Sequence, residues 1–314
     1  MDRATVDVVI VNWNSGAQLR ECLQSFAAVA DDGVAFRTIV IDNASVDGSA
    51  KGLEAPVPLS VVRNADNRGF GAACNQGAAG SDAEFLLFLN PDTRLLPGSL
   101  AQPVRYLRLT ENEHVGILGI QLTDSSGHVS RNTARAPTAW SMAGNSMGLD
   151  RLAPRLFPPH FVTEWAHDET KVVDQVMGAF FLVRRSVFEA LGGFDERFFV
   201  YYEDLDFSVR ARAQGWRSVY LATAQAFHRG QGTTEGATAR RTFYFCRSRI
   251  LYARKHFGAL GAFFVTAATL TVEPLARLAA APRSAGNTLR AFAMLWRDLP
   301  AILRRRRDRN ALDV

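Results

Sequence analysis

The chain has 314 residues, 47% of them hydrophobic and 21% charged, which is enough for one large core or two modest ones and too apolar for disorder. No repeat of about 20 to 50 residues runs through it, which excludes solenoids and propellers. Residues 1–239 carry 21 Lys and Arg against 27 Asp and Glu, whereas residues 240–314 carry 15 against 4. The body therefore has a net charge of −6 and the tail one of +11, which argues against an evenly basic surface for nucleic acid.

The cysteines and the N-terminus indicate a cytoplasmic protein. Cys22, Cys74 and Cys246 are scattered and odd in number, so we expect buried thiols in a reducing compartment. The first residues, MDRATVDVVIVNWNS, place acids beside Arg3 and hold only a short apolar run, which predicts no signal peptide.

Short apolar runs alternate with helix-periodic segments through the first 120 residues. Continuously apolar strands are typical of a parallel sheet that helices cover on both faces, so the pattern predicts a doubly wound α/β domain. Ligands of such sheets bind beyond the carboxyl ends of the strands. The predicted strands are residues 6–11, 36–41, 59–62 and 85–89, and the predicted helices are residues 19–26, 45–53 and 70–79.

The second half of the body begins with an irregular excursion over residues 121–174, rich in Pro, Arg, Asn and His. Long irregular segments in compact domains are usually lids or binding loops, so we expect this one to lie over the active face. The pattern then predicts a strand over residues 172–183, helices over residues 185–191 and 207–214, and a strand over residues 217–221.

Polar residues follow two of the predicted strands. Asp42 comes after the second strand, where a carboxylate can bind a nucleobase or ribose or can simply cap a helix. Asn90-Pro91-Asp92 comes after the fourth, where oxygen ligands on one side of the chain suit a hard cation on a diphosphate. The alternative there is an ordinary Asx-Pro turn.

The densest acidic cluster is Glu203, Asp204 and Asp206, which follows an aromatic run and opens a helix. Acids in a first helical turn stabilise the helix dipole, but one facing a cleft could also serve as a general base. His228 precedes a glycine-containing loop and could be a third metal ligand or a structural histidine.

Several motifs are missing from the sequence. It has no G-x-G-x-x-G after the first strand, no P-loop, no G-x-S-x-G and no Cys/His zinc pattern. These absences argue against a dinucleotide dehydrogenase, a P-loop NTPase, a serine hydrolase and a zinc enzyme.

Six blocks over residues 6–234 together resemble the inverting family 2 glycosyltransferases of the GT-A fold, and within them the bacterial rhamnosyltransferases. The resemblance implies a Rossmann-like doubly wound mixed sheet in a catalytic domain, residues 1–235, with a nucleotide-sugar half at about 1–120 and an acceptor half at about 121–235. Residues 236–314 would form a helical, basic C-terminal extension. The blocks are VVIVNWNS, VIDNASVDGS, NADNRGFGAACNQGA, FLLFLNPDT, GAFFLVRRSVFEALGGFDERFFVYYEDLDFSVRARAQGW and FHRGQGTT.

The same resemblance implies the site residues. Asp42 would hold the base, and Asn75 would brace the loop that runs along the diphosphate. The residues implied in nucleotide-sugar binding are Val11, Asn12, Asn14, Asp42, Asn67, Arg68, Gly69, Asn75, Asn90 and Gly178.

For the chemistry, the resemblance implies a divalent metal, Mg²⁺ or Mn²⁺, held by Asp92 and His228. Asp92 matches the metal-binding acid of the family's D-x-D element, whose first position is Asn90 in this chain. Asp204 matches the general base, with Glu203 beside it.

The expected function is transfer of L-rhamnose from dTDP-rhamnose to a glycan carried on a polyprenyl diphosphate, in cell-wall or surface polysaccharide synthesis. One alternative keeps the chemistry with a UDP- or GDP-hexose or galactofuranose donor. Another is a catalytically silent membrane scaffold, against which the retention of Asp92, Asp204 and His228 together argues.

The tail predicts peripheral attachment to the inner face of the cell membrane through residues of about 257–309. Residues 257–272 are sixteen uncharged residues, short of the ~20 that span a bilayer. Residues 289–303 carry an apolar face with Trp296, an arginine every seventh residue at 290, 297 and 304, and a basic run at 304–307. The alternative is a terminal helix packed on the catalytic domain.

Overall fold

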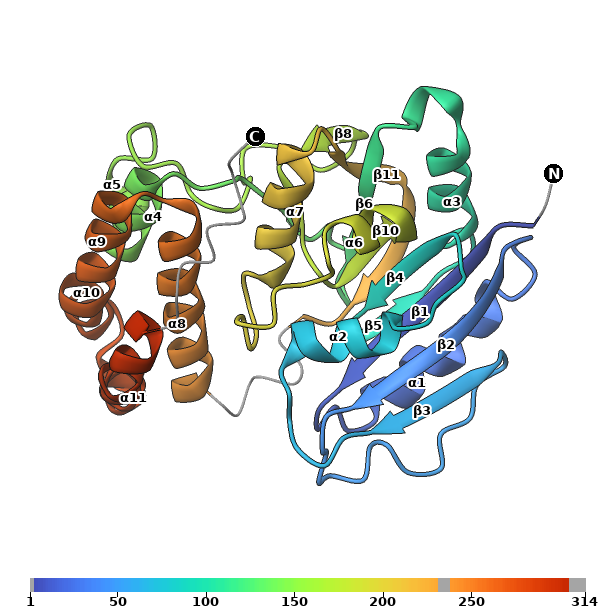
Figure 1. Ribbon diagram of the computed structural model, residues 1–314, viewed down its shortest axis with the longest axis horizontal. Helices are drawn as coiled ribbons and strands as arrows, with labels where there is room; N and C mark the ends of the chain where they lie inside the picture. Colours follow the sequence, from blue (N-terminus) through green and yellow to red (C-terminus); the bar gives the residue numbers. More distant parts are fainter. Residues whose placement is uncertain (1–2, 231–237, 305–314) are drawn as a thin grey trace. The chain divides into compact units, whose positions relative to one another are not determined.

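The computed structural model describes residues 3–230 and 238–304 (Figure 1). Its contacts divide the chain into two compact units. The first comprises residues 1–134, 162–196 and 203–233, and the second comprises residues 135–161, 197–202 and 234–314. The domain boundary expected near residue 235 stays a prediction, because units of dense contact need not coincide with domains.

The first unit is built on a nine-stranded mixed sheet in the order β3-β2-β1-β4-β10-β6-β11-β5, with β8 also paired to β11. The strands β1 to β4 form a parallel half, as predicted, whereas β10 runs antiparallel between β4 and β6. A separate pair, β7 and β9, is antiparallel. The strands are β1 (Thr5–Asn12), β2 (Ala35–Asp42), β3 (Leu59–Arg63), β4 (Phe85–Leu89), β5 (Thr93–Leu95), β6 (Val115–Thr123), β7 (Thr133–Ala134), β8 (Lys171–Val173), β9 (Gln175–Val176), β10 (Phe180–Arg184) and β11 (Arg217–His228).

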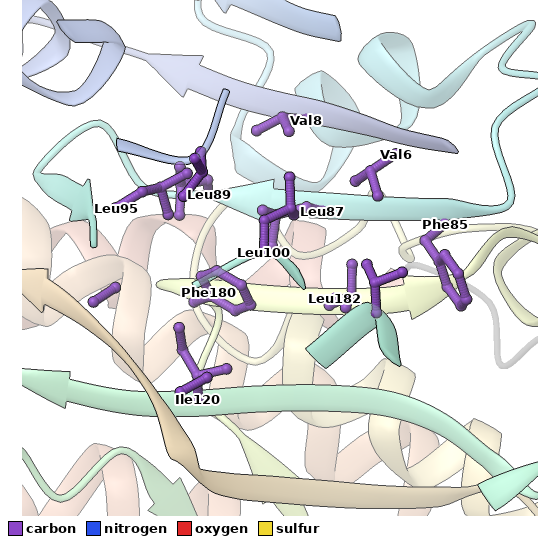
Figure 2. Packing of buried hydrophobic residues seen from close by; sticks show 14 of the residues in the cluster. Val6, Val8, Phe85, Leu87, Leu89, Leu95, Leu100, Ile120, Phe180 and Leu182 are labelled. Carbon is purple, nitrogen blue, oxygen red and sulfur yellow. The ribbon is translucent and has the colours of Figure 1, made fainter. Parts of the chain in front are cut away.

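Helices cover both faces of this sheet, which produces two cores. In β1, Val6, Val8 and Ile10 pack into one core, while Val9 and Val11 pack into the other, as the two-residue period of a strand requires. Figure 2 shows part of the first core, to which the neighbouring strands β1, β4, β10 and β6 all contribute side chains. The helical segments of this unit are α1 (Gln18–Ser25), η1 (Phe26–Ala28), α2 (Phe70–Ala78), α3 (Ala101–Arg108), η2 (Thr110–Asn112), α6 (Arg185–Ala190) and α7 (Glu203–Ala213).

Some of the predicted secondary structure was wrong or incomplete. Residues 45–53 form turns instead of a helix, because Asp47 accepts a hydrogen bond from the Ser49 amide and Gly48 has a φ of 80°. The single strand expected over residues 172–183 breaks into β8, β9 and β10. The strand β6 was not predicted, although it lies between β10 and β11.

The second unit is helical in its described part. The helix α4 begins with a capping box in which the Thr138 hydroxyl accepts from the Ser141 amide. The segments α9, η3 and α10 run on as one helix of 22 residues, Ala259–Ala280, which is long and apolar enough to cross a membrane by length and composition. The helix therefore extends beyond the uncharged residues 257–272, which the sequence analysis took as too short to span a bilayer. The elements are α4 (Ala139–Ser146), α5 (Leu149–Leu152), α8 (Thr238–His256), α9 (Ala259–Ala267), the π-helical η3 (Ala268–Val272), α10 (Glu273–Ala280), η4 (Pro282–Ser284) and α11 (Ala285–Arg304).

Candidate active site

The predicted site residues meet at one edge of the first unit's sheet. Because β1, β2 and β4 are parallel, Asn12, Asp42 and Asn90 all lie at their carboxyl ends. The strand β10 is antiparallel to both β4 and β6, so β4 and β6 run in the same direction. The strand β11 is parallel to β6 and therefore also ends at this edge, with His228. The antiparallel β10 begins at the same edge, two residues after Gly178.

Asp92 and His228 are brought together by strand pairing. The strand β5 follows Asp92 directly and pairs antiparallel with the end of β11, so that Thr93 is opposite His228. The Arg229 amide donates to the Asp92 carbonyl at 3.1 Å. As a result, His228 Nε2 lies 3.3 Å from Asp92 Oδ1, and both side chains are largely buried.

Asn90-Pro91-Asp92 forms a turn, which was one of the two interpretations of this triplet. The Thr93 amide donates to the Asn90 carbonyl at 3.1 Å, while the Asn90 amide donates to the Ala179 carbonyl at 3.0 Å. The turn does not compete with the cation-binding interpretation, because it presents the Asp92 carboxylate to His228.

Asp42 is held by the end of the neighbouring strand. It is 5% exposed, and one of its carboxylate oxygens accepts from Asn12 Nδ2 at 2.8 Å. Asn12 Nδ2 also donates to Ser49, and Asn14 accepts from the Val46 amide. These asparagines therefore fix the loop after β2 in place, and the buried Val11 lies beside them in β1.

A chain of amides that the sequence analysis missed links this loop to α2. Asn43 Nδ2 donates to the Gly69 carbonyl at 3.0 Å, and its own carbonyl oxygen accepts from Asn64. Asn64 in turn exchanges hydrogen bonds with Gln76. Their positions could have identified Asn43 and Asn64 as site residues, because Asn43 directly follows β2 and Asn64 directly follows β3.

The loop before α2 has the backbone expected for a close approach to a ligand. Gly69 caps α2 at a φ of 89°, and its amide donates to Asn67 Oδ1 at 2.9 Å. The Arg68 side chain beside it is exposed. The Asn75 side chain does not bond this loop as expected. Its Nδ2 donates to the Phe194 carbonyl, and its Oδ1 accepts from the Phe194 amide.

The Asp204 carboxylate is positioned at the start of α7. One oxygen accepts from the Gly178 amide at 3.0 Å and the other from the Leu205 amide at 2.8 Å. Burial raises the pKa of Asp204 above its ordinary value, although these hydrogen bonds and one from Gln175 oppose the shift. Gly178, predicted as a nucleotide-sugar contact, thus lies against the predicted base.

The two acids beside Asp204 have different environments. Glu203 is 6% exposed and its Oε2 has no hydrogen-bond partner, so burial, together with the charge of Asp204, raises its pKa strongly. Burial also raises the pKa of Cys74 in α2, which lies near Glu203. Asp206 is fully buried and paired with Arg210 at 2.8 Å, which makes it structural. The arrangement therefore favours Asp204 as the ionised acid.

The chain reaches Glu203 through a strained segment of the second unit. Tyr201 and Tyr202 both have positive φ values, 66° and 72°, which cost energy in bulky residues. The helix α8 holds this segment, since Ser248 donates to the Val200 carbonyl at 2.8 Å. Phe199 stacks on Tyr244 with ring centroids 4.6 Å apart.

Asp92 and His228 fit a divalent cation, although they make up only two protein ligands. Within residues 3–230 and 238–304, no group of three His, Cys, Asp or Glu could hold a metal ion. A carboxylate oxygen and an imidazole nitrogen are nevertheless ligands for Mn²⁺ or Mg²⁺, and a diphosphate supplies further oxygens. Asp92 and His228 thus suit a divalent ion whose remaining ligands come from the diphosphate of a bound nucleotide.

Comparison with known proteins identifies similar sequences. Residues 3–248 match the family described as "Glycosyltransferase like family 2". The chain is 29% identical over 234 residues to the N-acetylglucosaminyl-diphospho-decaprenol L-rhamnosyltransferase of Mycobacterium tuberculosis, covering 70% of this chain and 75% of that one. It is 27% identical over 151 residues to rhamnosyltransferase WbbL of Escherichia coli, covering 47% of this chain and 53% of that one.

Solved structures confirm the fold. A mannosyltransferase from Pyrobaculum calidifontis, in complex with GDP-Man and Mn²⁺, superposes with a TM-score of 0.52 at 17% identity over 97% of this chain and 82% of that one. GalNAc-T7 with UDP, GalNAc and Mn²⁺ superposes with a TM-score of 0.51 at 17% identity over 74% of this chain and 44% of that one. The expected GT-A sheet with C-terminal helices is therefore confirmed.

Proposed function

The chain belongs to the family 2 glycosyltransferases, and from this premise we propose that it is an inverting enzyme that moves L-rhamnose from dTDP-rhamnose to a glycan acceptor. The observation that carries the proposal is that Asp204, which accepts a hydrogen bond from the Gly178 amide, and the Asp92–His228 pair lie at the same edge of the sheet. The two named rhamnosyltransferases among its relatives support the choice of sugar.

In the proposed reaction, Asp204 accepts the proton of an acceptor hydroxyl as that oxygen attacks the anomeric carbon. A new glycosidic C–O bond forms while the bond to the diphosphate breaks on the opposite face, so the anomeric configuration inverts and the nucleoside diphosphate leaves. The raised pKa of Asp204 makes it a stronger proton acceptor than an ordinary aspartate. The Gly178 amide holds the carboxylate through the reaction.

Asp92 and His228 would hold Mg²⁺ or Mn²⁺, and Asp42 and the Gly69 loop would hold the nucleotide. The ion would neutralise the charge that develops on the leaving diphosphate. His228 lies close enough to Asp92 for both to bind one ion.

The proposed acceptor is a glycan on a polyprenyl diphosphate, used in cell-wall or surface polysaccharide synthesis. The name of the M. tuberculosis relative, which describes such a lipid-linked acceptor, supports this choice. The proposed localisation is cytoplasmic, on the inner face of the cell membrane.

A donor screen tests the proposal. Thermal unfolding is measured with dTDP-rhamnose, UDP-glucose, UDP-galactofuranose and GDP-mannose, each with Mn²⁺, Mg²⁺ or EDTA, because a ligand that binds only the folded protein raises its Tm. Release of nucleoside diphosphate is then measured for each donor. We expect dTDP-rhamnose to give both the largest shift and metal-dependent turnover. Turnover only with a UDP or GDP donor would show that the enzyme transfers another sugar by the same chemistry. Binding of donors without turnover would favour the catalytically silent membrane scaffold.

A further inference from the structure

The second unit exposes an unusual amount of apolar side chain. Of the eighteen large hydrophobic residues exposed among those described, twelve lie in this unit, which holds about a third of the described chain. Large exposed apolar surfaces on folded domains usually mark an interaction site. The twelve are Trp140, Leu152, Leu156, Phe161, Leu260, Phe263, Phe264, Val272, Leu275, Leu289, Trp296 and Leu303.

Part of this surface is a stripe along the continuous helix of α9, η3 and α10. Leu260 and Phe264 begin it, 69% and 55% exposed, and Leu275 extends it, 67% exposed. The opposite side of the same helix is fixed to α8, because Glu273 forms a buried ion pair with Arg249 at 2.7 Å. A spanning orientation would pull Glu273 away from this partner into hydrocarbon, so the helix is suited to lie along a surface.

A second stripe runs along α11. The apolar face predicted for residues 289–303 divides in two, since Phe292, Leu295 and Ile302 are buried in the unit. Leu289, Trp296 and Leu303 instead stay 59%, 52% and 46% exposed, at intervals of seven residues. They form one line on a helix, because seven residues make about two turns.

An arginine follows each residue of that line. Arg290, Arg297 and Arg304 are exposed and repeat with the same interval. An apolar line beside a cationic line is the pattern of a helix that lies in the interface of a membrane. The further basic run at residues 305–307, part of the predicted membrane contact, lies outside the described residues.

A distant part of the sequence adds to the surface. The helix α4 approaches α9 closely, since a Cβ on Gly261 would lie 2.9 Å from the Ala139 Cβ. Trp140 is therefore next to the beginning of the α9 stripe, and it is 66% exposed while stacked on Phe157. The sequence alone did not suggest that residues 135–161 take part.

We propose that the second unit docks on an anionic lipid leaflet through the lipid-facing surface, which comprises the two stripes described above and Trp140, together with Arg290, Arg297 and Arg304. Charge complementarity identifies the occupant, because the described residues of this unit carry fifteen Lys and Arg against three Asp and Glu, a net charge of +12. A neutral protein partner or a second copy of so basic a surface would lack this complementarity. The proposal holds whichever sugar the first unit transfers.

Co-sedimentation of the full chain with vesicles tests this surface. The vesicles are phosphatidylcholine alone or phosphatidylcholine with phosphatidylglycerol, each at low and high salt. We expect binding only to the anionic vesicles, weakened by salt. The triple variant R290Q/R297Q/R304Q should bind about a hundredfold more weakly, which converts to about 1 kcal/mol for each arginine.

A second variant and a matched control separate the surface from general charge. L289Q/W296Q/L303Q should lose binding with an unchanged Tm, because these side chains are already exposed. K51Q/R105Q/R217Q removes three exposed cations of the first unit and should bind as the parent does. The proposal is overturned if the parent chain does not bind anionic vesicles or if the control loses as much binding as the arginine variant. It is also overturned if the surface variants abolish self-association but bind the vesicles as the parent chain does.

Discussion

The buried ion pair between Arg249 and Glu273 allows a quantitative prediction. Arg249 Nη1 lies 2.7 Å and Nη2 3.2 Å from the two Glu273 oxygens, and the side chains are only 5% and 4% exposed. Solvent therefore screens the pair little. Arg277, which is 38% exposed, adds a second and weaker partner to Glu273.

Removing either partner should leave a buried charge without compensation. We expect E273Q to lower the free energy of unfolding by about 5 kcal/mol, because an arginine cannot lose its proton. R249M should cost less, about 3 kcal/mol, because Arg277 still pairs with Glu273. R277Q should cost no more than about 1 kcal/mol, since that pair is partly solvated.

The double variant R249M/E273L decides whether the single losses come from stranded charge. Apolar side chains of similar volume should restore stability to within about 1 kcal/mol of the parent. Urea unfolding followed by circular dichroism, extrapolated to water, measures all four variants. The reasoning is refuted if E273Q costs less than about 1 kcal/mol, or if the double variant loses the sum of the single losses.

The same pair sets a pH dependence. Burial raises the pKa of Glu273, but the charges of Arg249 and Arg277 outweigh burial and leave it below the usual range. The ion pair should thus stabilise the fold above the ordinary glutamate pKa of about 4.3, and this stabilisation should be lost as the pH falls through the lower folded value. The parent's advantage over E273Q should shrink in acid, whereas a constant difference would contradict this assignment.

Four further results are expected. D204N should lower kcat by at least ~10² with donor binding retained, and E203Q should cost less because burial and the charge of Asp204 raise the pKa of Glu203 strongly, so the reverse order would identify Glu203 as the base. The kcat of the parent should rise with pH through a value above the ordinary aspartate pKa of about 3.9, and a limb at or below it would refute the raised pKa of Asp204. D92A should remain folded but lose metal-dependent donor binding in calorimetry, and full turnover of the parent in excess EDTA would rule out the metal. G119A should lower the free energy of unfolding by about 1–3 kcal/mol, because its Cβ would lie 2.7 Å from the Val176 Cβ, and an unchanged urea midpoint would show that the strand relaxes freely.

The sequence predicted what depends on local pattern. The strands β1 and β4 are buried on both faces, so their continuous apolar runs were sufficient. Asp42 and Asn90-Pro91-Asp92 followed from the strand ends, because parallel strands end at one edge, whereas the resemblance to the family implied the other site residues. The strand β6 was missed because Gly116 and Gly119 interrupt its apolar run, and these glycines make room for Trp216 and Val176, which only the folded chain brings near.

Other features depended on contacts that no local pattern contains. Asn75 lies in the α2 block that resembles the family, yet its partner is a backbone 119 residues away. The antiparallel pairing that joins Asp92 to His228 links positions on β5 and β11, and the length of β11 beyond residue 221 was not predicted. Only the folded chain shows why Asp204 and not Glu203 is proposed as the base, because Asp204 accepts a hydrogen bond from the Gly178 amide whereas Glu203 Oε2 has no partner.

The helix α8 holds the backbone that leads to the proposed base, so the C-terminal extension supports the proposed site. A shortened chain that ended at residue 235 would keep every predicted ligand and the base, so it would look like a self-sufficient enzyme from its sequence. It would nevertheless lose the Ser248 hydroxyl that holds the Val200 carbonyl and the Tyr244 ring that covers Phe199. It would also lose Phe245, whose ring contacts the rings of Tyr201 and Tyr202, the two residues that have positive φ angles. Removing the extension would therefore take these contacts from the backbone directly before Glu203 and Asp204, so a fragment that ended at residue 235 would be a poor substitute for the full chain in an assay of transfer.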